Sequence, residues 1–358
     1  MVEWKKLGDL LFFEQPTPYL VKSTEYNDSY RVPVLTAGQS LLLGYTNEED
    51  GVYRASEDIP TIIFDDFTTS FHWINFDFKV KSSAMKMLRP KRGINFRYVY
   101  YAMLCINFVP GGHQRHWISK YSQLEIPIPS LSEQERIVGI LDTFTAAIEN
   151  LKEQIAQRRK QYEHYRDQLL DLEGKDGVER TFLKAICEVV NGRAYSQPEL
   201  LSEGKYRVLR VGNFFSNDSW YYSNLELDDK YYCEDGDLLY AWSASFGPHI
   251  WGEEKVIYHY HIWKMNCSDK IQKKFLYYWL QSEDMKKQAF TNLHGATMAH
   301  LTKALIESLM VPVPSFHVQH RIVSILDTFE ASIQNLEAQL KQREKQYEYY
   351  RNKLLTFE

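Results

Sequence analysis

A segment of 37 residues occurs twice in this 358-residue chain, and this repeat constrains the architecture more than any other feature. The first copy covers residues 134–170 and the second covers residues 319–355, which places the copies 185 positions apart. Of the 37 aligned positions 24 are identical, with no gap. A repeat of this length indicates that one structural unit is used twice. The sequence therefore predicts a pseudo-dimer within one polypeptide, in which two copies of a long helix alternate with two globular segments.

Both copies carry the apolar spacing of a coiled coil. Large apolar residues recur at intervals of three and four residues, and each copy has one seven-residue gap that contains an arginine. This pattern, sustained over nearly five heptads, is typical of helices that pair along a seam, and an arginine in the seam would help to fix the register. The predicted seam includes Ile137, Leu141, Phe144, Ile148, Leu151 and Arg158 in the first copy, and Ile322, Leu326, Phe329, Ile333, Leu336 and Arg343 in the second.

The presence of two matched seams favours pairing of the helices with each other over packing of each helix on its own domain. If the globular domains lie at opposite ends of the pair, the helices must run antiparallel. Ser132 followed by Glu135 predicts a capping box at the start of the first helix, and Gly174 is a suitable stop after it.

The globular segments repeat at their ends and differ in their interiors. The segment VEWKKLGDL at 2–10 matches VERTFLKAI at 178–186 at several positions, and LEIPIPS at 124–130 matches LMVPVPS at 309–315. Between these ends, short β-rich runs are bounded by Gly, Asp or Ser, and one or two helices are expected late in each segment. The β-rich runs are PTIIFDDF, FHWINFDFKV, YRVLRVGNFF, GDLLYAW and KVIYHYHIWKM.

The predicted fold class is therefore α+β. It consists of two pseudo-repeated globular domains separated by two long helices that form an antiparallel coiled coil. The predicted boundaries are 1–130 for the first domain, 131–174 for the central helix, 175–315 for the second domain and 316–358 for the C-terminal helix.

Composition limits the class of protein. A hydrophobic content of 44% and an aromatic content of 15% are typical of globular proteins rather than disordered ones. The apolar runs are too short to span a bilayer, and the charged amino terminus does not resemble a signal peptide, so a cytoplasmic location is expected. No CxxC pair is present, which favours buried free thiols over a disulfide framework or a zinc site. The four cysteines are Cys105, Cys187, Cys233 and Cys267.

One stretch has a composition suited to contact with DNA. Residues 78–124 contain no Asp or Glu and nine basic residues, with aromatic residues interleaved. Basic side chains at polar loop tips favour contact with phosphates, although a charge run is more often a solvated face. The net charge of −5 argues against tight binding by bulk electrostatics alone. The basic residues are Lys79, Lys81, Lys86, Arg89, Lys91, Arg92, Arg97, Arg115 and Lys120.

The candidate DNA-binding residues lie near expected turns in both halves. Arginine pairs well with guanine edges and asparagine with adenine edges, while ordinary turn chemistry is the alternative for each motif. The pair His259 and His261, in a strand-like pattern without nearby acids, is expected to be structural. The candidates in the first half are Thr68, Thr69, Ser70, Lys91, Arg92, His113, Gln114, Arg115 and His116. The candidates in the second half are Asn191, Arg193, Tyr195, Arg210, Asn213, Trp242, Ser243, Ser245, His294 and Thr297.

Motifs that would indicate catalysis are missing from the sequence. There is no glycine-rich phosphate loop, no HExxH and no Asn-Pro-Pro-Tyr type of methyltransferase tetrapeptide. Asp237, Glu253 and Lys255 match the loose D…ExK spacing of a metal-dependent endonuclease. That spacing often arises by chance, and Asp237 fits better as part of a turn that enters a strand.

The chain resembles the specificity subunit of Type I restriction–modification systems. The resemblance rests on the repeated helices with LSEQERIVGILDTF at 131–144, on the Pro-x-Pro-Ser turns that precede them, and on the diversified domain interiors. In the second copy HVQHRIV replaces SEQERIV, and the capping box is lost. The resemblance implies two target recognition domains that bind a bipartite site in double-stranded DNA, with the paired helices as spacer.

The resemblance also implies partners. Two methyltransferase subunits would dock on the helices, restriction subunits would join the complex, and S-adenosylmethionine would bind to the methyltransferase partners. This chain would then have no cofactor, metal or catalytic residue of its own. Two alternatives are a stand-alone nuclease that uses Asp237, Glu253 and Lys255, and a coiled-coil adaptor with no DNA role. The adaptor would not explain why the domain interiors diverge while the helices stay matched.

Overall fold

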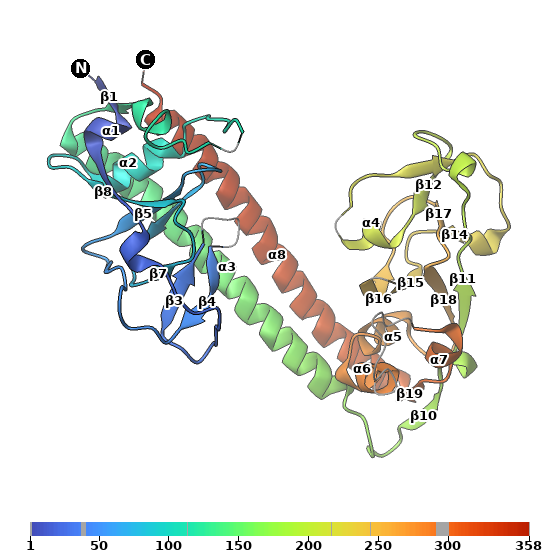
Figure 1. Ribbon diagram of the computed structural model, residues 1–358. Helices are drawn as coiled ribbons and strands as arrows, with labels where there is room; N and C mark the ends of the chain where they lie inside the picture. The colour runs from blue at the N-terminus through green and yellow to red at the C-terminus, as the bar shows by residue number, and fades with distance from the viewer. Residues whose placement is uncertain are drawn as a thin grey trace. The chain divides into compact units, whose positions relative to one another are not determined.

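The computed structural model describes residues 2–36, 41–112, 114–215, 217–243, 245–290 and 301–357. The chain divides into two compact units, unit 1 with Met1–Lys152 and Gln339–Glu358, and unit 2 with Glu153–Ala338. The division falls within the long helices α3 (Leu131–Leu170) and α8 (Phe316–Leu355), so that each unit contains one globular domain and part of both helices (Figure 1). Among the described residues, no helix is both long and apolar enough to cross a bilayer.

Unit 1 contains short strands in three sheets within its described ranges. One sheet has the antiparallel order β2-β8-β5-β6, a second has β3 between antiparallel β4 and parallel β7, and β1 pairs with β9. The globular elements are β1 (Glu3–Lys6), α1 (Leu7–Leu10), β2 (Leu11–Glu14), η1 (Thr17–Tyr19), β3 (Val32–Leu35), β4 (Leu42–Thr46), β5 (Thr61–Asp65), β6 (Phe71–Ile74), β7 (Lys79–Val80), β8 (Met85–Pro90), α2 (Phe96–Met103), η2 (Tyr121–Gln123) and β9 (Glu125–Ile128).

Unit 2 repeats this topology. The order β11-β18-β15-β16 corresponds to β2-β8-β5-β6, and the parallel pair β12 and β17 corresponds to β3 and β7. Its globular elements are β10 (Glu179–Phe182), η3 (Leu183–Ala185), β11 (Cys187–Asn191), η4 (Gln197–Glu199), β12 (Tyr206–Leu209), α4 (Val211–Phe215), β13 (Tyr221–Ser223), η5 (Asp229–Tyr231), β14 (Tyr232–Cys233), β15 (Leu238–Ser243), β16 (Ser245–Ile250), β17 (Val256–Tyr258), β18 (Ile262–Cys267), α5 (Lys273–Trp279), α6 (Glu283–Phe290), α7 (Lys303–Glu307) and β19 (Met310–Val313).

Two predicted strands of the second half are corrected by the structure. The run at 206–215 is a strand only as far as Leu209 and then forms the short helix α4. The run at 255–265 is divided into β17 and β18, because the chain turns between Tyr258 and Ile262. The pair His259 and His261 therefore lies in a turn rather than on one face of a strand.

The two long helices begin at equivalent positions, and a buried glutamine anchors each start. Gln134 accepts a hydrogen bond from the backbone of Asn95 and donates one to the carbonyl of Pro129 at 2.8 Å. Gln319, at the equivalent position, makes the same pair of contacts with Gln272 and with Pro314, the latter also at 2.8 Å. A buried amide must satisfy its donors and acceptors, so these contacts fix where each helix meets its domain.

The ends of the first helix differ from the prediction. The hydroxyl that accepts from a first-turn backbone N–H belongs to Ser130, which bonds Glu133 at 3.3 Å, and not to Ser132. The helix ends at Leu170, four residues before Gly174. The loss of the capping box in the second copy does not displace the start of α8, because the buried glutamine is present in both copies.

The helices α3 and α8 form an antiparallel coiled coil (Figure 1). In unit 1 the rings of Phe144 and Tyr350 stack with centroids 5.3 Å apart, and in unit 2 those of Tyr165 and Phe329 stack at 5.5 Å. Residue numbers rise along α3 while those of the contacted residues fall along α8, which defines the antiparallel direction. The two stacked pairs are also equivalent under the 185-residue shift, so the same contact is made once in each unit.

The seam arginines do not occupy the core. Arg343 is exposed, with its guanidinium 5.7 Å from the ring centre of Phe144, and Arg158 is half-buried at 5.8 Å from that of Phe329. Each arginine therefore covers an aromatic ring of the other helix and keeps its charge near solvent. The apolar seam residues are better buried near the domains, where Ile137, Leu141, Ile322 and Leu326 are at most 4% exposed, than at Leu151 and Leu336.

A second repeated joint links each domain to the helix pair. In unit 1 Asp142 of α3 accepts from Arg97 at 2.9 Å and from the hydroxyl of Tyr101, both on α2. In unit 2 Asp327 of α8 accepts from Lys274 at 2.8 Å and from Tyr278 at 2.6 Å, both on α5. Burial raises the pKa of both tyrosines, and the hydrogen bond to the carboxylate raises it further.

Candidate nucleic-acid interface

A buried aspartate joins the loops that carry the candidates of unit 1. Asp66 follows β5, is 1% exposed, and accepts from the ammonium group of Lys86 at 3.0 Å and from the backbone of Trp117 at 2.7 Å. Its carbonyl accepts from the backbone of His116 at 2.8 Å. Since a buried carboxylate without partners is costly, this group holds the β5–β6 turn beside the segment that follows residue 113.

The hydroxyl candidates form the β5–β6 turn. Asp65 accepts from the hydroxyl of Thr68 at 2.9 Å, and that hydroxyl lies 2.7 Å from that of Ser70. Thr69 has a φ of 60°, in the left-handed region that non-glycine residues rarely adopt. Such a conformation persists only where its surroundings impose it, as the bonds of this turn do. Thr68 is exposed and Thr69 is buried.

The acid-free stretch does not present all its charges as one free basic surface. Lys79 pairs with Glu48 at 3.1 Å, Lys86 with Asp66, and Arg97 with Asp142, so that other parts of the chain supply the missing acids. The counted excess of basic residues therefore overstates the charge that is available to a ligand.

The remaining candidates of unit 1 differ in exposure. Arg92, Gln114 and Arg115 are exposed, and within the described ranges neither arginine forms an ion pair. Lys91 is half-buried and donates to the carbonyl of Gly8 at 2.7 Å. The fully buried His116, with its ring 5.6 Å from that of Phe108, is not accessible to a ligand in this structure. The candidate His113 lies outside the described residues.

In unit 2 aromatic and histidine rings surround the β17–β18 turn. The indole of Trp242 stacks on Trp263 with centroids 5.5 Å apart and donates to the carbonyl of Tyr260 at 2.9 Å. The rings of Tyr260 and His261 lie 3.9 Å apart, and Tyr260 is 38% exposed. Planar side chains at an exposed turn can stack on bases or contact sugars. Sequence reasoning did not propose this turn as a binding site, although its aromatic content was visible.

His259, which precedes Tyr260 in this turn, is neutral near pH 7. Burial, followed by the charges of His261 and Arg210, lowers the pKa of His259 to about 4. Tyr195 stacks on the same ring, with centroids 6.4 Å apart. The backbone approaches closely here, because a Cβ added at Gly192 would lie 2.3 Å from the carbonyl oxygen of His259. Only glycine fits at that position.

The structure gives the polar candidates of unit 2 different surroundings. Arg193 is paired with Glu199 at 2.6 Å, and Arg210 lies 4.3 Å from the ring centre of Tyr221. The amide of Asn213 donates to two carbonyls of its own loop and accepts from the backbone of Arg210, which is a local structural role. Asn191 is exposed at the end of β11.

Of the four remaining candidates, two lie in the β15–β16 hairpin and two lie in an undescribed range. Ser243 and Ser245 are opposite each other where β15 and β16 meet, and Ser245 is the exposed member of the pair. The candidates His294 and Thr297 lie outside the described residues.

The nuclease-like triplet does not form a metal site. Asp237 pairs with Lys264 at 3.3 Å, Glu253 with Arg207 at 2.7 Å, and Lys255 with Glu234 at 2.9 Å. Among the described residues, no group of three or more histidine, cysteine or acidic side chains could hold a metal ion.

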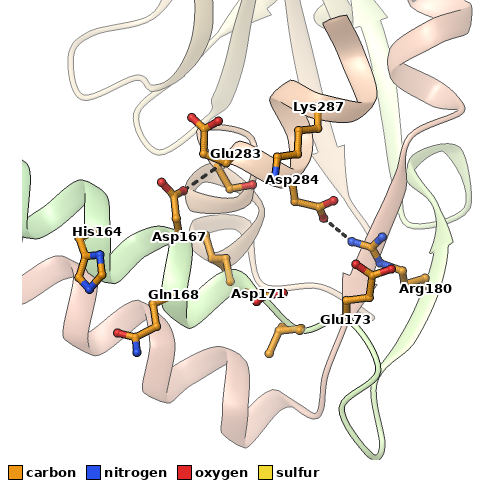
Figure 2. Close-up of a pocket in the computed structure, with 12 residues that line it drawn as sticks. His164, Asp167, Gln168, Asp171, Glu173, Arg180, Glu283, Asp284 and Lys287 are labelled. Carbon is orange, nitrogen blue, oxygen red and sulfur yellow. Dashed lines mark hydrogen bonds and ion pairs between the residues drawn. The ribbon is translucent and has the colours of Figure 1, made fainter. Parts of the chain in front are cut away.

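A cavity of about 550 Å³ lies at the end of α3 in unit 2 (Figure 2). Asp167 from α3, Asp171 and Glu173 from the segment after it, and Glu283 and Asp284 from α6 line it together with Arg180. Asp167 accepts from the backbone of Glu283 at 3.1 Å, and Asp284 pairs with Arg180. So many carboxylates would repel phosphates, which makes this cavity a structural joint rather than part of a DNA site.

Comparison with known proteins assigns the family. The family model described as the type I restriction modification DNA specificity domain matches residues 1–158 and 175–344. The specificity subunit of the Escherichia coli type I restriction enzyme EcoR124I/EcoR124II is 36% identical over 389 residues, covering 99% of this chain and 94% of that protein. The chain belongs to this family. Its members recognise DNA and are not themselves catalytic, and neither the nuclease nor the adaptor alternative is supported.

Two solved structures share the fold of this specificity chain. The S subunit of the type I restriction–modification system of M. genitalium has a TM-score of 0.63 at 17% identity, and the match covers 100% of this chain and 97% of that one. A chain from a structure of complex assembly and conformational transition of the type I system has a TM-score of 0.57 at 16% identity, covering 99% and 96%.

The residues that sequence reasoning missed are those that join domain to helix. Gln134 and Gln319, and likewise Asp142 and Asp327, are identical between the two copies of the repeat. Polar residues retained at matched positions beside an apolar seam were the available signal. Asp66 gives no such signal, because its partners are distant in the sequence.

Proposed function

We propose that each globular domain of this specificity chain recognises one half of a bipartite, asymmetric site in double-stranded DNA. The observation that carries the proposal is one framework used twice with different loops. Gln134 and Gln319 share the same pair of contacts, and Asp142 and Asp327 each accept from one basic residue and one tyrosine. Two frameworks of the same kind that present different side chains suit two different base sequences.

The loops support different modes of contact in the two units. Unit 1 offers the flexible side chains of Arg92, Gln114 and Arg115, which suit phosphates and base edges. Unit 2 offers the planar rings around Trp242 and Tyr260. Chemistry that differs between units would give the two half-sites different sequences.

The paired helices would act as the spacer and as the docking surface for two methyltransferase subunits, to which restriction subunits are added. S-adenosylmethionine would be bound by the methyltransferase partners, and the chain itself would contribute recognition without a chemical step. Partners that supply phosphate contacts would also make the net charge of −5 compatible with DNA binding.

Mapping of methylated bases in cells that carry this chain with its methyltransferase partners tests the proposal. We expect methylated adenines at one interrupted, asymmetric sequence, and no methylation when the chain is omitted. Methylation of an uninterrupted site, or methylation that does not depend on this chain, would contradict the proposal.

Arg115→Ala is expected to weaken DNA binding by about 1–3 kcal/mol if the guanidinium contacts a base edge. If it contacts only phosphate, binding should fall equally on all sequences and show a shallower salt dependence. The measurement is a titration of DNA with the methyltransferase-bound chain at several salt concentrations. Arg54→Ala, which removes an exposed arginine of the same domain already paired with Asp77, is the matched control and should leave binding unaltered. Unchanged affinity of Arg115→Ala at every salt concentration would exclude this loop from the interface.

A further inference from the structure

Two cysteines lie directly opposite each other in unit 2. Cys187 begins β11, Cys267 ends β18, and the two are partners in the antiparallel register. Opposed residues of antiparallel strands have Cα atoms about 4.5 or 5.5 Å apart, according to the hydrogen-bonding pattern. A disulfide spans Cα separations of about 4.4–6.8 Å. Either arrangement therefore allows a disulfide without displacement of the strands, and both thiols are free in this structure.

The contacts that flank the pair hold it in register. On one side the amide of Asn266 donates to the carboxylate of Glu188 at 3.1 Å across the two strands. On the other side the backbone of Ser268 donates to the carbonyl of Ile186 at 2.8 Å. The side chains of Cys187 and Cys267 lie within interaction range of each other, and the thiol of Cys187 also lies 3.7 Å from the carbonyl oxygen of Glu188.

The two thiols differ in accessibility and acidity. Cys267 is half-buried, whereas Cys187 is only 3% exposed. The hydrogen bond from Cys187 lowers the pKa of Cys267, and the positive charge of Lys273 adds to this against the opposing effect of burial. Burial raises the pKa of Cys233, and partial desolvation raises the pKa of Cys105 although that residue is exposed. A thiolate is the reactive form of cysteine, so Cys267 has the features of an attacking thiol and Cys187 those of its resolving partner.

We propose that Cys187 and Cys267 form a reversible disulfide, with hydrogen peroxide as the oxidant. The Cys267 thiolate attacks one peroxide oxygen, the O–O bond breaks, and the hydroxide that leaves takes up a proton to form water. The sulfur of Cys187 then attacks the sulfenic sulfur of Cys267. The S–S bond forms, the S–O bond breaks, and the thiol proton of Cys187 leaves with the hydroxide as a second water. The two thiols lose two electrons, and the peroxide accepts them.

The bond would enclose residues 188–266, which carry most of the candidate recognition residues of unit 2. It would lie at one end of β11, whereas Asn191 at the other end of this strand is opposite Trp263. The equivalent pair in unit 1 is Leu11 and Pro90, so the first domain lacks the thiols. The disulfide would therefore stabilise one domain only, and this inference does not depend on which DNA sequence the chain recognises.

The test is oxidation of the purified full-length chain with a small excess of hydrogen peroxide, followed by mapping of linked peptides by mass spectrometry without reduction. We expect a Cys187–Cys267 linked peptide that disappears after reduction. A closed loop of this length also constrains the unfolded chain, so the melting temperature of the second domain should rise by roughly 5–10 °C. Cys267→Ser should abolish both changes, while a Cys105→Ser and Cys233→Ser double variant should retain them.

Mapping of the unsubstituted chain is decisive even if a variant folds poorly. Oxidation of Cys267 to sulfinic or sulfonic acid without a linked peptide would overturn the proposal. So would linkage confined to Cys105 of two molecules, or a chain that peroxide leaves fully reduced.

Discussion

Replacement of residues 7–124 by the matching segment of another specificity chain is expected to change one half of the methylated site completely and to leave the other half unaltered. The backbone of Leu7 donates to the carbonyl of Leu124 at 2.9 Å, and that of Leu183 donates to the carbonyl of Leu309 at 2.9 Å. These two equivalent bonds close the globular part of each unit. Replacement of the segment from Leu7 to Leu124 leaves β1, β9 and both long helices unchanged.

The donor segment has to preserve the joint to α3. It should carry a basic residue and a tyrosine where this chain has Arg97 and Tyr101, because both bond to Asp142. A replacement segment without these two residues would leave the half-buried carboxylate of Asp142 without its partners. The exchanged chain would then lose stability, and this loss would be hard to distinguish from a loss of specificity. Thermal unfolding of the exchanged chain separates the two effects.

The reciprocal exchange of residues 183–309 is the matched control. It should alter the other half-site alone, and maps of methylated adenines from cells with each exchanged chain measure both outcomes. If either exchange changes both halves of the site, the domains do not recognise DNA independently, and the proposed division of the site is wrong.

Features of the fold that depend on residues close together in the sequence could be predicted, whereas contacts between distant segments could not. The paired helices were predictable because their pattern repeats every three or four residues, and because two copies of it gave independent support. The fold class of the domains followed from the turn residues and the β-rich runs. The antiparallel stacking of Phe144 on Tyr350 and of Tyr165 on Phe329 confirms that part of the prediction.

Interactions between distant segments could not be predicted in this way. The charges of Lys79 and Lys86 are neutralised by Glu48 and Asp66, which lie outside the acid-free stretch. A count of charges within one segment is therefore a poor measure of the field that a ligand meets. The same limit applies to the cysteines, because Cys187 and Cys267 are 80 positions apart in the sequence and adjacent only through strand pairing.

Lengthening both long helices by four residues, after Ala156 in α3 and after Lys341 in α8, is expected to lengthen the unspecified spacer of the DNA site by one or two base pairs. Four residues add about 6 Å to an α-helix, and they overshoot one full turn by only about 40°. One base pair advances DNA by about 3.4 Å. The half-sites should keep their bases, because no residue of either globular domain changes.

Insertion into one helix alone should disrupt the coiled coil, because the two stacked ring pairs would no longer both be aligned. In the antiparallel pair, 21 positions separate Phe144 from Tyr165 on α3, and 21 separate Phe329 from Tyr350 on α8. An insertion in α3 only makes these lengths unequal, and the two ring pairs of the seam cannot both form. Matched insertions keep the lengths equal, which is why both helices have to be changed.

Insertion of two residues at the same positions is the control. Two residues rotate the following turns by about 200°, which moves the apolar stripe to the solvent side. Exposure of seam residues such as Ile148 and Ile155 costs about 1.5–3 kcal/mol each, enough to reduce assembly with the methyltransferase partners more than tenfold. Methylation maps and gel filtration of the assembled complex measure the two results. If the four-residue variant methylates only the original spacing, the helices do not set the distance between half-sites, and the methyltransferase partners must position the two domains on DNA.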